Sequence, residues 1–178
     1  MPATQPAPDA VLPDPVVALA GRLQHKYRDR ICAELVLPGS VAETAELPAD
    51  LAESLAAAVS VRGIRQLYSH QAEAWRLAMQ REHYVVVTPT ASGKTLCYNL
   101  PVLQSVLTEG AKALYLFPTK ALAQDQVAEL LELNRAGDLG VRAYTFDGDT
   151  PGDARKAVRT RGDTVVTNPH MLHQATLP

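Results

Sequence analysis

The sequence has two cysteines, few aromatic residues and no excess of positive charge. Cys32 and Cys97 are isolated and lack the C-x-x-C spacing of zinc sites, so we expect two reduced thiols. The net charge is −2, so nucleic-acid binding would have to arise from locally placed groups. There is no apolar run of transmembrane length and no basic-then-apolar leader. These absences predict a cytoplasmic protein without a membrane partner.

Length and composition indicate one globular domain with an extension. The chain has 178 residues, of which 47% are hydrophobic and 20% charged, as in ordinary globular proteins. Residues 1–14 are rich in Pro and Ala, which predicts a disordered tail. Residues 15–66 form the predicted N-terminal helical extension. Within it we expect helices near 15–23 and 48–62, the second ending at Gly63, and a strand over 30–37.

Beyond this extension, short apolar runs alternate with helical stretches. The runs, which we predict to be strands, are 84–87, 113–117, 141–146 and 164–167. Helices are predicted to begin near Lys94, Thr119 and Pro151, and an earlier one is expected to be capped by Ser69. Pro101 should kink or end the first of the three. This alternation predicts an α/β fold with a parallel sheet, flanking helices and ligands at the carboxyl ends of the strands.

A loop of small residues, 88–95, follows the run at 84–87 and opens a helix. In a phosphate-binding loop, backbone N–H groups and the positive end of a helix point at the phosphates. We expect Lys94 to contact the β- and γ-phosphates and the Thr95 hydroxyl to be a Mg²⁺ ligand. Thr88 stands where the usual pattern has glycine, and the alternative is a turn with a solvated lysine. The residues expected to hold phosphate are Thr90, Ala91, Ser92, Gly93, Lys94 and Thr95.

Polar clusters also follow three predicted strands. Their candidate binding residues are Thr119, Lys120, Gly148, Asp149, Thr150, Thr167 and Asn168. The carboxyl ends of parallel strands meet at one edge of a sheet, so we expect these clusters to lie together. Small hydroxyl, amide and glycine groups there suit a phosphodiester backbone without reading its bases. Taken singly, each cluster is also explained by a helix cap or a turn.

Together these motifs resemble the first RecA-like domain of superfamily 2 DEAD/DEAH-box helicases, and within that group the MrfA/YprA-like DNA helicases of bacteria. The resemblance runs from about residue 67 to the end and is weaker from residue 15 onward. It rests on Gln71 and on residues 90–95, 118–126, 147–150 and 167–169. It implies that residues 67–178 form a partial RecA-like, ATP-binding P-loop domain, incomplete at its C-terminus.

The resemblance also implies roles for individual residues. Gln71 would recognise adenine, with Tyr68 beside it, and the loop around Lys94 would bind ATP and Mg²⁺. The segments containing Thr119, Gly148 and Thr167 would contact single-stranded DNA. Ala91 stands where DEAD-box RNA helicases commonly have glycine, which favours DNA over RNA.

The implied activity is that of an ATP-dependent DNA helicase, and hence an ATP hydrolase. Such enzymes need a strand ending in Asp-Glu and arginines from a second RecA-like domain. The sequence contains neither, since Asp147 is followed by Gly148, so we expect an amino-terminal fragment without catalytic residues. The alternatives are a nucleotide-controlled nucleic-acid-binding module without unwinding and a DEAD-box RNA helicase. A small P-loop kinase would need acceptor-binding groups that we cannot place.

Overall fold

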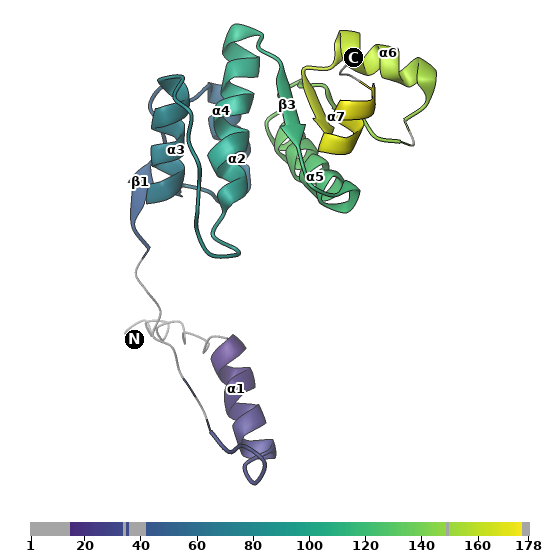
Figure 1. The fold of residues 1–178 in the computed structure, drawn as a ribbon. Coiled ribbons are helices and arrows are strands. Elements are labelled where there is room, and N and C mark those ends of the chain that lie inside the picture. The colour runs from purple at the N-terminus through teal and green to yellow at the C-terminus, as the bar shows by residue number, and fades with distance from the viewer. Residues whose placement is uncertain (1–14, 34, 36–41, 149, 176–178) are drawn as a thin grey trace, which may run out of the picture. The chain divides into compact units, whose positions relative to one another are not determined.

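The computed structural model describes residues 15–33, 35, 42–148 and 150–175. The chain divides into two compact units, residues 1–41 and 42–178. The first contains α1 (Pro15–Lys26), which confirms the predicted helix and leaves Val16, Val17 and Leu19 exposed (Figure 1). Residues 30–33 and 35 do not form the predicted strand; the rest of that segment and the predicted tail lie outside the described residues.

The second unit opens with a short antiparallel pair, β1 (Thr44–Glu46) and β2 (Gln66–Tyr68), that the sequence did not predict. Between them lies α2 (Glu53–Val61), which begins later than expected and ends where Gly63 takes a φ of 77°. The buried amide of Gln104 accepts a hydrogen bond from the Ala52 N–H (2.9 Å) at the start of α2. Residues 42–66, assigned to the extension from sequence, therefore pack in this unit; the boundary at residue 66 stays a prediction.

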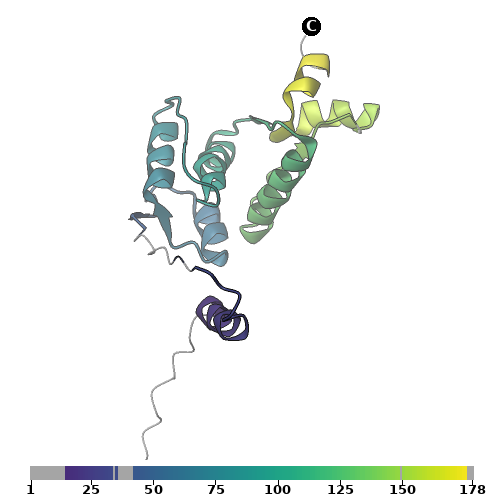
Figure 2. The ribbon, with the colours of Figure 1, turned by 60° about the horizontal axis from the view of Figure 1, so that its bottom comes forward.

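Four helices surround the main hydrophobic core: α2, α3 (Ser69–Met79), α4 (Lys94–Glu109) and α5 (Lys120–Ala136). Figures 1 and 2 both show α3 and α4 side by side (Figure 1, Figure 2). Each helix buries residues spaced three or four apart, the period of one helical face. The central residues are Leu55, Val59, Trp75, Leu100, Leu103, Leu130 and Leu133. Among the described helices, none is long and apolar enough to cross a membrane.

A three-stranded parallel sheet has the order β3 (Ala113–Leu116), β5 (Thr164–Thr167), β4 (Ala143–Thr145). This confirms three of the predicted strands and their parallel direction. Tyr115 and Val166 pack with Val127 of α5. Phe146 packs with Val158 of α6 (Gly152–Arg161) and Met171 of α7 (Pro169–Ala175). The predicted α/β fold is present.

The predicted strand at 84–87 is wrong for this structure. In the part of the chain that is described, these residues have no strand partner, and the side chains of Val85 and Val87 are each 88% exposed. A β-strand exists only through hydrogen bonds to a neighbouring strand. Apolar, β-branched composition alone therefore cannot make this run a strand.

Pro101 does not end α4, which continues to Glu109. Proline removes one backbone hydrogen bond from a helix. The packing of the helix offsets that loss, because Leu100, Pro101 and Leu103 are all buried. The expectation that the helix stops here is thus overridden by tertiary contacts.

Gly137 offers a test of how closely α2 and α5 pack. A β-carbon added there would lie 2.5 Å from the Ser54 carbonyl oxygen and 2.8 Å from Ala58 Cβ. We expect Gly137→Ala to lower the free energy of unfolding by about 1–3 kcal/mol, the usual cost of overpacking. Chemical denaturation measures this, with Gly148→Ala as the control because nothing lies within 4 Å of its added β-carbon. Equal unfolding midpoints for the two variants would contradict the packing.

Candidate functional site

The loop before α4 folds around the ammonium group of Lys94. Its Nζ donates to the carbonyl oxygens of Thr88 (2.9 Å) and Pro89 (2.6 Å) and lies 3.3 Å from the hydroxyls of Thr88 and Ser92. Those two hydroxyls are themselves hydrogen-bonded at 2.6 Å. Phosphate oxygens are stronger acceptors for an ammonium group than neutral carbonyls. A bound phosphate would therefore compete with the loop carbonyls for Lys94.

Two residues of this loop adopt left-handed backbone conformations. Gly93 has a φ of 75°, and a β-carbon on it would lie 2.6 Å from Nε2 of Gln71. Glycine is therefore favoured at this position. Ala91 has a φ of 59°, which costs an L-residue roughly 1–2 kcal/mol. Strain of this kind is common where a loop is shaped for a ligand.

The side chain of Gln71 ties α3 to the end of the loop. Its Nε2 donates to the Gly93 carbonyl (2.8 Å), and its Oε1 accepts from the Tyr68 N–H (2.9 Å). Gln71 is only 4% exposed. The predicted cap is wrong, because Tyr68 occupies the N-cap position and Ser69 is already helical. Gln71 thus bridges α3 and the loop in the structure, and its role in adenine recognition stays a prediction.

His70 is a site residue that the sequence reasoning missed. Its Nε2 lies 2.9 Å from the Ser92 carbonyl oxygen, and its ring stacks on Tyr68 at 5.8 Å with an interplanar angle of 11°. Tyr68 is 45% exposed. A pocket of about 230 Å³ joins this stack to Ala91 and Ser92. Since bases stack on aromatic rings, this pocket lies where an adenine could reach both the rings and the loop.

Helix α4 is tied on both sides just beyond Lys94 and Thr95. The Tyr84 hydroxyl donates to the Cys97 carbonyl oxygen (2.8 Å). The Tyr98 hydroxyl donates to Oε1 of Gln126 on α5. Burial raises the pKa of Tyr84 and of Tyr98, so both hydroxyls keep their protons at neutral pH. The helix that carries Lys94 is therefore held to the segment before the loop and to α5.

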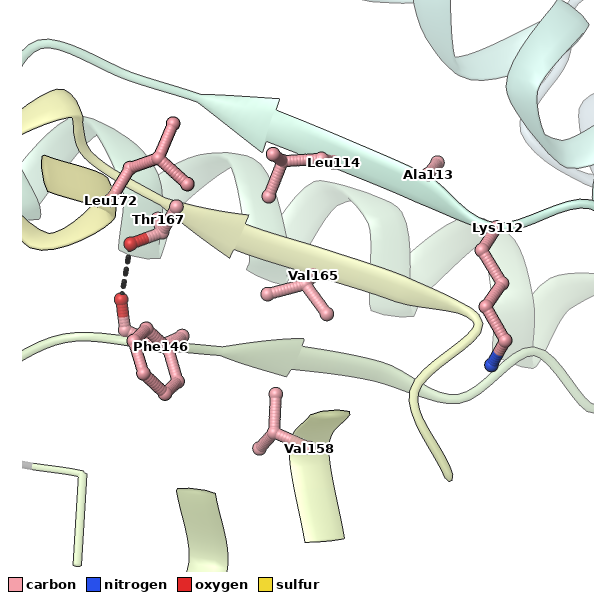
Figure 3. A pocket seen from close by; sticks show the side chains of 8 residues that line it. All are labelled: Lys112, Ala113, Leu114, Phe146, Val158, Val165, Thr167 and Leu172. Atoms are coloured by element: carbon pink, nitrogen blue, oxygen red, sulfur yellow. Dashed lines mark hydrogen bonds between the residues drawn. The ribbon is translucent and has the colours of Figure 1, made fainter. Parts of the chain in front are cut away.

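The three strand exits lie at one edge of the sheet, as expected, and several of their side chains have structural partners. The Thr119 hydroxyl accepts from the Leu122 N–H (3.2 Å) and caps α5. Asn168 Oδ1 accepts from the Met171 N–H (2.9 Å) at the start of α7. The Thr167 hydroxyl, 3% exposed, donates to the Phe146 carbonyl (2.5 Å; Figure 3). These contacts agree with the cap and turn interpretation, and nucleic-acid contact stays a prediction.

Lys120 and Asp147 come together from two of these exits. Lys120 Nζ lies 3.7 Å from Asp147 Oδ2, and the Asp147 N–H donates to the Thr150 hydroxyl (3.0 Å). Both side chains line an open pocket of about 520 Å³ with Gln124 and Thr150. Gly148 is exposed beside it, and Asp149 lies outside the described residues. This edge presents a half-exposed cation next to a turn.

A third pocket, apolar and of about 280 Å³, lies against the open face of the sheet (Figure 3). It is lined by Lys112, Ala113, Leu114, Phe146, Val158, Val165, Thr167 and Leu172. Thr167 is the one predicted site residue in its lining, and its hydroxyl is bonded to Phe146. An apolar pocket does not suit a phosphodiester. In the described residues no cluster of three His, Cys, Asp or Glu side chains could hold a metal ion.

Comparison with known proteins matches most of this chain to a helicase family. Residues 68–177 match the family model described as DEAD/DEAH box helicase. The chain is 53% identical over 138 residues to the ATP-dependent helicase YprA of Bacillus subtilis, covering 77% of this chain and 18% of that protein. It is 38% identical over 161 residues to the ATP-dependent helicase hrq1 of Schizosaccharomyces pombe, covering 87% and 15%.

A solved structure is also similar to this chain. It is the DUF1998 helicase MrfA bound to DNA and AMPPNP, with a TM-score of 0.72 and 52% identity, covering 75% of this chain and 19% of that one. The chain thus spans less than a fifth of the length of these relatives.

The geometry of Lys94 leads to a first test of the loop. We expect Lys94→Ala to weaken Mg²⁺–ATP binding about tenfold to a hundredfold, because a charge-assisted contact is worth roughly 1.5–3 kcal/mol. Calorimetric titration of the intact protein with a non-hydrolysable ATP analogue measures the affinity. Lys112→Ala is the matched control, since that ammonium bonds to the Gly162 carbonyl (2.7 Å) at the start of the sheet. Unchanged affinity of Lys94→Ala for the ATP analogue would contradict the assignment of this loop as a phosphate-binding loop.

Proposed function

Because the chain belongs to the DEAD/DEAH box helicase family, we propose that it is the ATP-binding part of an ATP-dependent DNA helicase. The observation that carries the proposal is the loop folded around Lys94, inside the region that matches the family. Relatives that are 53% and 38% identical are named ATP-dependent helicases. A 52% identical one is seen with DNA and AMPPNP.

The loop residues suit ATP and Mg²⁺ chemically. Gly93 keeps the backbone clear of a β-carbon, and Lys94 offers an ammonium group at the start of a sixteen-residue helix. The Thr95 hydroxyl is a hard oxygen donor of the kind that Mg²⁺ prefers beside phosphate oxygens. When bound, the ion would neutralise charge on the phosphates. Thr90, Ala91 and Ser92 would complete the cradle, and Tyr68 and Gln71 would contact the base.

The strand exits would hold the backbone of single-stranded DNA. Thr119, Thr167 and Asn168 already bond to the protein through their side chains, so their segments would contact phosphates through backbone groups of neighbouring residues. Lys120, with its side chain 44% exposed, would supply the charge, and Gly148 and Thr150 flank it. Asp149 belongs to the same proposal. Ala91 and the DNA-bound relative favour DNA over RNA.

A second candidate function is a nucleotide-controlled binding module. It is favoured by the environment of Asp147, whose carboxylate lies beside Lys120 and accepts a hydrogen bond from the Thr150 hydroxyl (3.3 Å). The sequence has no Asp-Glu pair that would hold Mg²⁺ and activate water. An unwinding assay on the intact protein, with ATP and a partly single-stranded DNA duplex, separates the two. ATP-dependent strand separation supports the helicase, and DNA binding without it supports the module.

Lys120 permits a specific test of the DNA proposal. We expect single-strand binding by the intact protein to weaken as salt rises, because each neutralised phosphate adds roughly 0.7 to the slope of log affinity against log salt. Lys120→Ala should flatten that slope by about this amount. Affinity is measured by fluorescence anisotropy across a salt series, with Lys112→Ala as the control. The same slope in wild type and Lys120→Ala would show that Lys120 does not contact a DNA phosphate.

The 178 residues alone should not turn over ATP. Positioning and charge stabilisation supply nearly all the catalysis of phosphoryl transfer, and the carboxylates needed for both are missing from the sequence. A phosphate-release assay on the purified chain measures turnover, and Lys94→Ala reports contamination by other ATPases. Turnover that this substitution abolishes would mean that a catalytic acid lies within these residues, with Asp147 the first to test.

A further inference from the structure

Pro101 leaves one carbonyl oxygen of α4 without its helical donor. In an α-helix each N–H donates to the carbonyl four residues earlier, and proline has no N–H. The carbonyl affected is that of Cys97, three residues after Lys94 and two after Thr95. Cys97 is 1% exposed, so water has little access to replace the missing donor. A buried carbonyl left without a partner is costly.

The missing donor comes from Tyr84. Its hydroxyl donates to the Cys97 carbonyl oxygen at 2.8 Å, from a residue thirteen positions earlier in the chain. The loop that holds Lys94 lies wholly between these two residues. The hydrogen bond therefore joins the segment that enters the loop to the helix that leaves it.

Tyr84 belongs to the segment that enters the loop. No strand among the described residues pairs with residues 84–87, and Val85 and Val87 are exposed. Side-chain contacts must fix this segment against α4. Tyr84 is half-buried, and burial raises its pKa, so the hydroxyl remains a donor at neutral pH.

We propose that Tyr84 is a positioning residue for the nucleotide. Its hydroxyl replaces the helical hydrogen bond that Pro101 removes, and it thereby fixes the first turn of α4, with Lys94 and Thr95, against the entry of the loop. This inference rests on the proposed ATP-binding function. Without the hydroxyl, a smaller fraction of the molecules would have the loop geometry that binds phosphate. The apparent affinity for nucleotide would fall in proportion to that fraction.

The test is a double-mutant cycle in the intact protein with Tyr84→Phe, Pro101→Ala and their combination. Tyr84→Phe should raise the Kd for a Mg²⁺–ATP analogue, and the KM for ATP, about threefold to tenfold. The kcat should change much less, since Tyr84 touches no reacting atom. Pro101→Ala restores a backbone N–H to the helix, so Tyr84→Phe should have little effect in that background.

Tyr115→Phe is the matched control. It also removes a tyrosine hydroxyl bonded to α4, but that hydroxyl donates to the Asn99 side chain (3.0 Å) rather than to the backbone. We expect it to leave nucleotide affinity unchanged even where it lowers the melting temperature. This comparison stands even if Pro101→Ala fails to fold.

Two results would overturn the inference. One is that Tyr84→Phe lowers nucleotide affinity equally in the wild-type and Pro101→Ala backgrounds. The other is that Tyr84→Phe lowers nucleotide affinity no more than Tyr115→Phe does. The Lys94→Ala variant separates this failure from a failure of the proposed function. If Lys94→Ala abolishes binding while Tyr84→Phe does nothing, only the role of Tyr84 is lost. If neither substitution changes nucleotide affinity, the loop does not bind the nucleotide.

Discussion

The contact between the Lys94 ammonium group and the carbonyls of its own loop is the interaction on which the site depends. While Lys94 bonds to these carbonyls, Ala91 and Gly93 of the same loop adopt left-handed conformations. The Gly93 carbonyl also accepts from Gln71. The loop is thus bonded to its own lysine and attached to α3.

Helix α4 connects this loop to the rest of the unit. Its first turn carries Lys94 and Thr95, and its later turns bury Leu100 and Leu103 in the main core. Tyr98 links it to Gln126 of α5, the helix that begins beside Lys120. The proposed nucleotide and DNA sites are therefore joined through packed helices. Packed helices have few alternative arrangements, which suits a part that must keep two sites in a fixed relation.

At the strand exits, the observed structural roles fall on residues for which we propose a functional role. A parallel sheet places the starts of its following helices at one edge, and each start needs a cap. Thr119 and Asn168 are such caps. The same helix starts expose backbone N–H groups that attract phosphates. A cap residue at these exits is therefore compatible with the proposed DNA contact, and Lys120 is the side chain that distinguishes binding from capping alone.

The sequence alone determined the features that depend on neighbouring residues. The loop that opens α4, the helical faces, the end of α2 near Gly63 and three of the predicted strands follow from local spacing and composition, and the structure contains them. It did not determine whether residues 84–87 form a strand, because a strand needs a partner from elsewhere in the chain. It also did not show that α4 passes Pro101, or that Gln71 and His70 bond to Gly93 and Ser92. Only the tertiary structure decided these, because each depends on packing or hydrogen bonds between residues that the sequence keeps apart and the fold brings together.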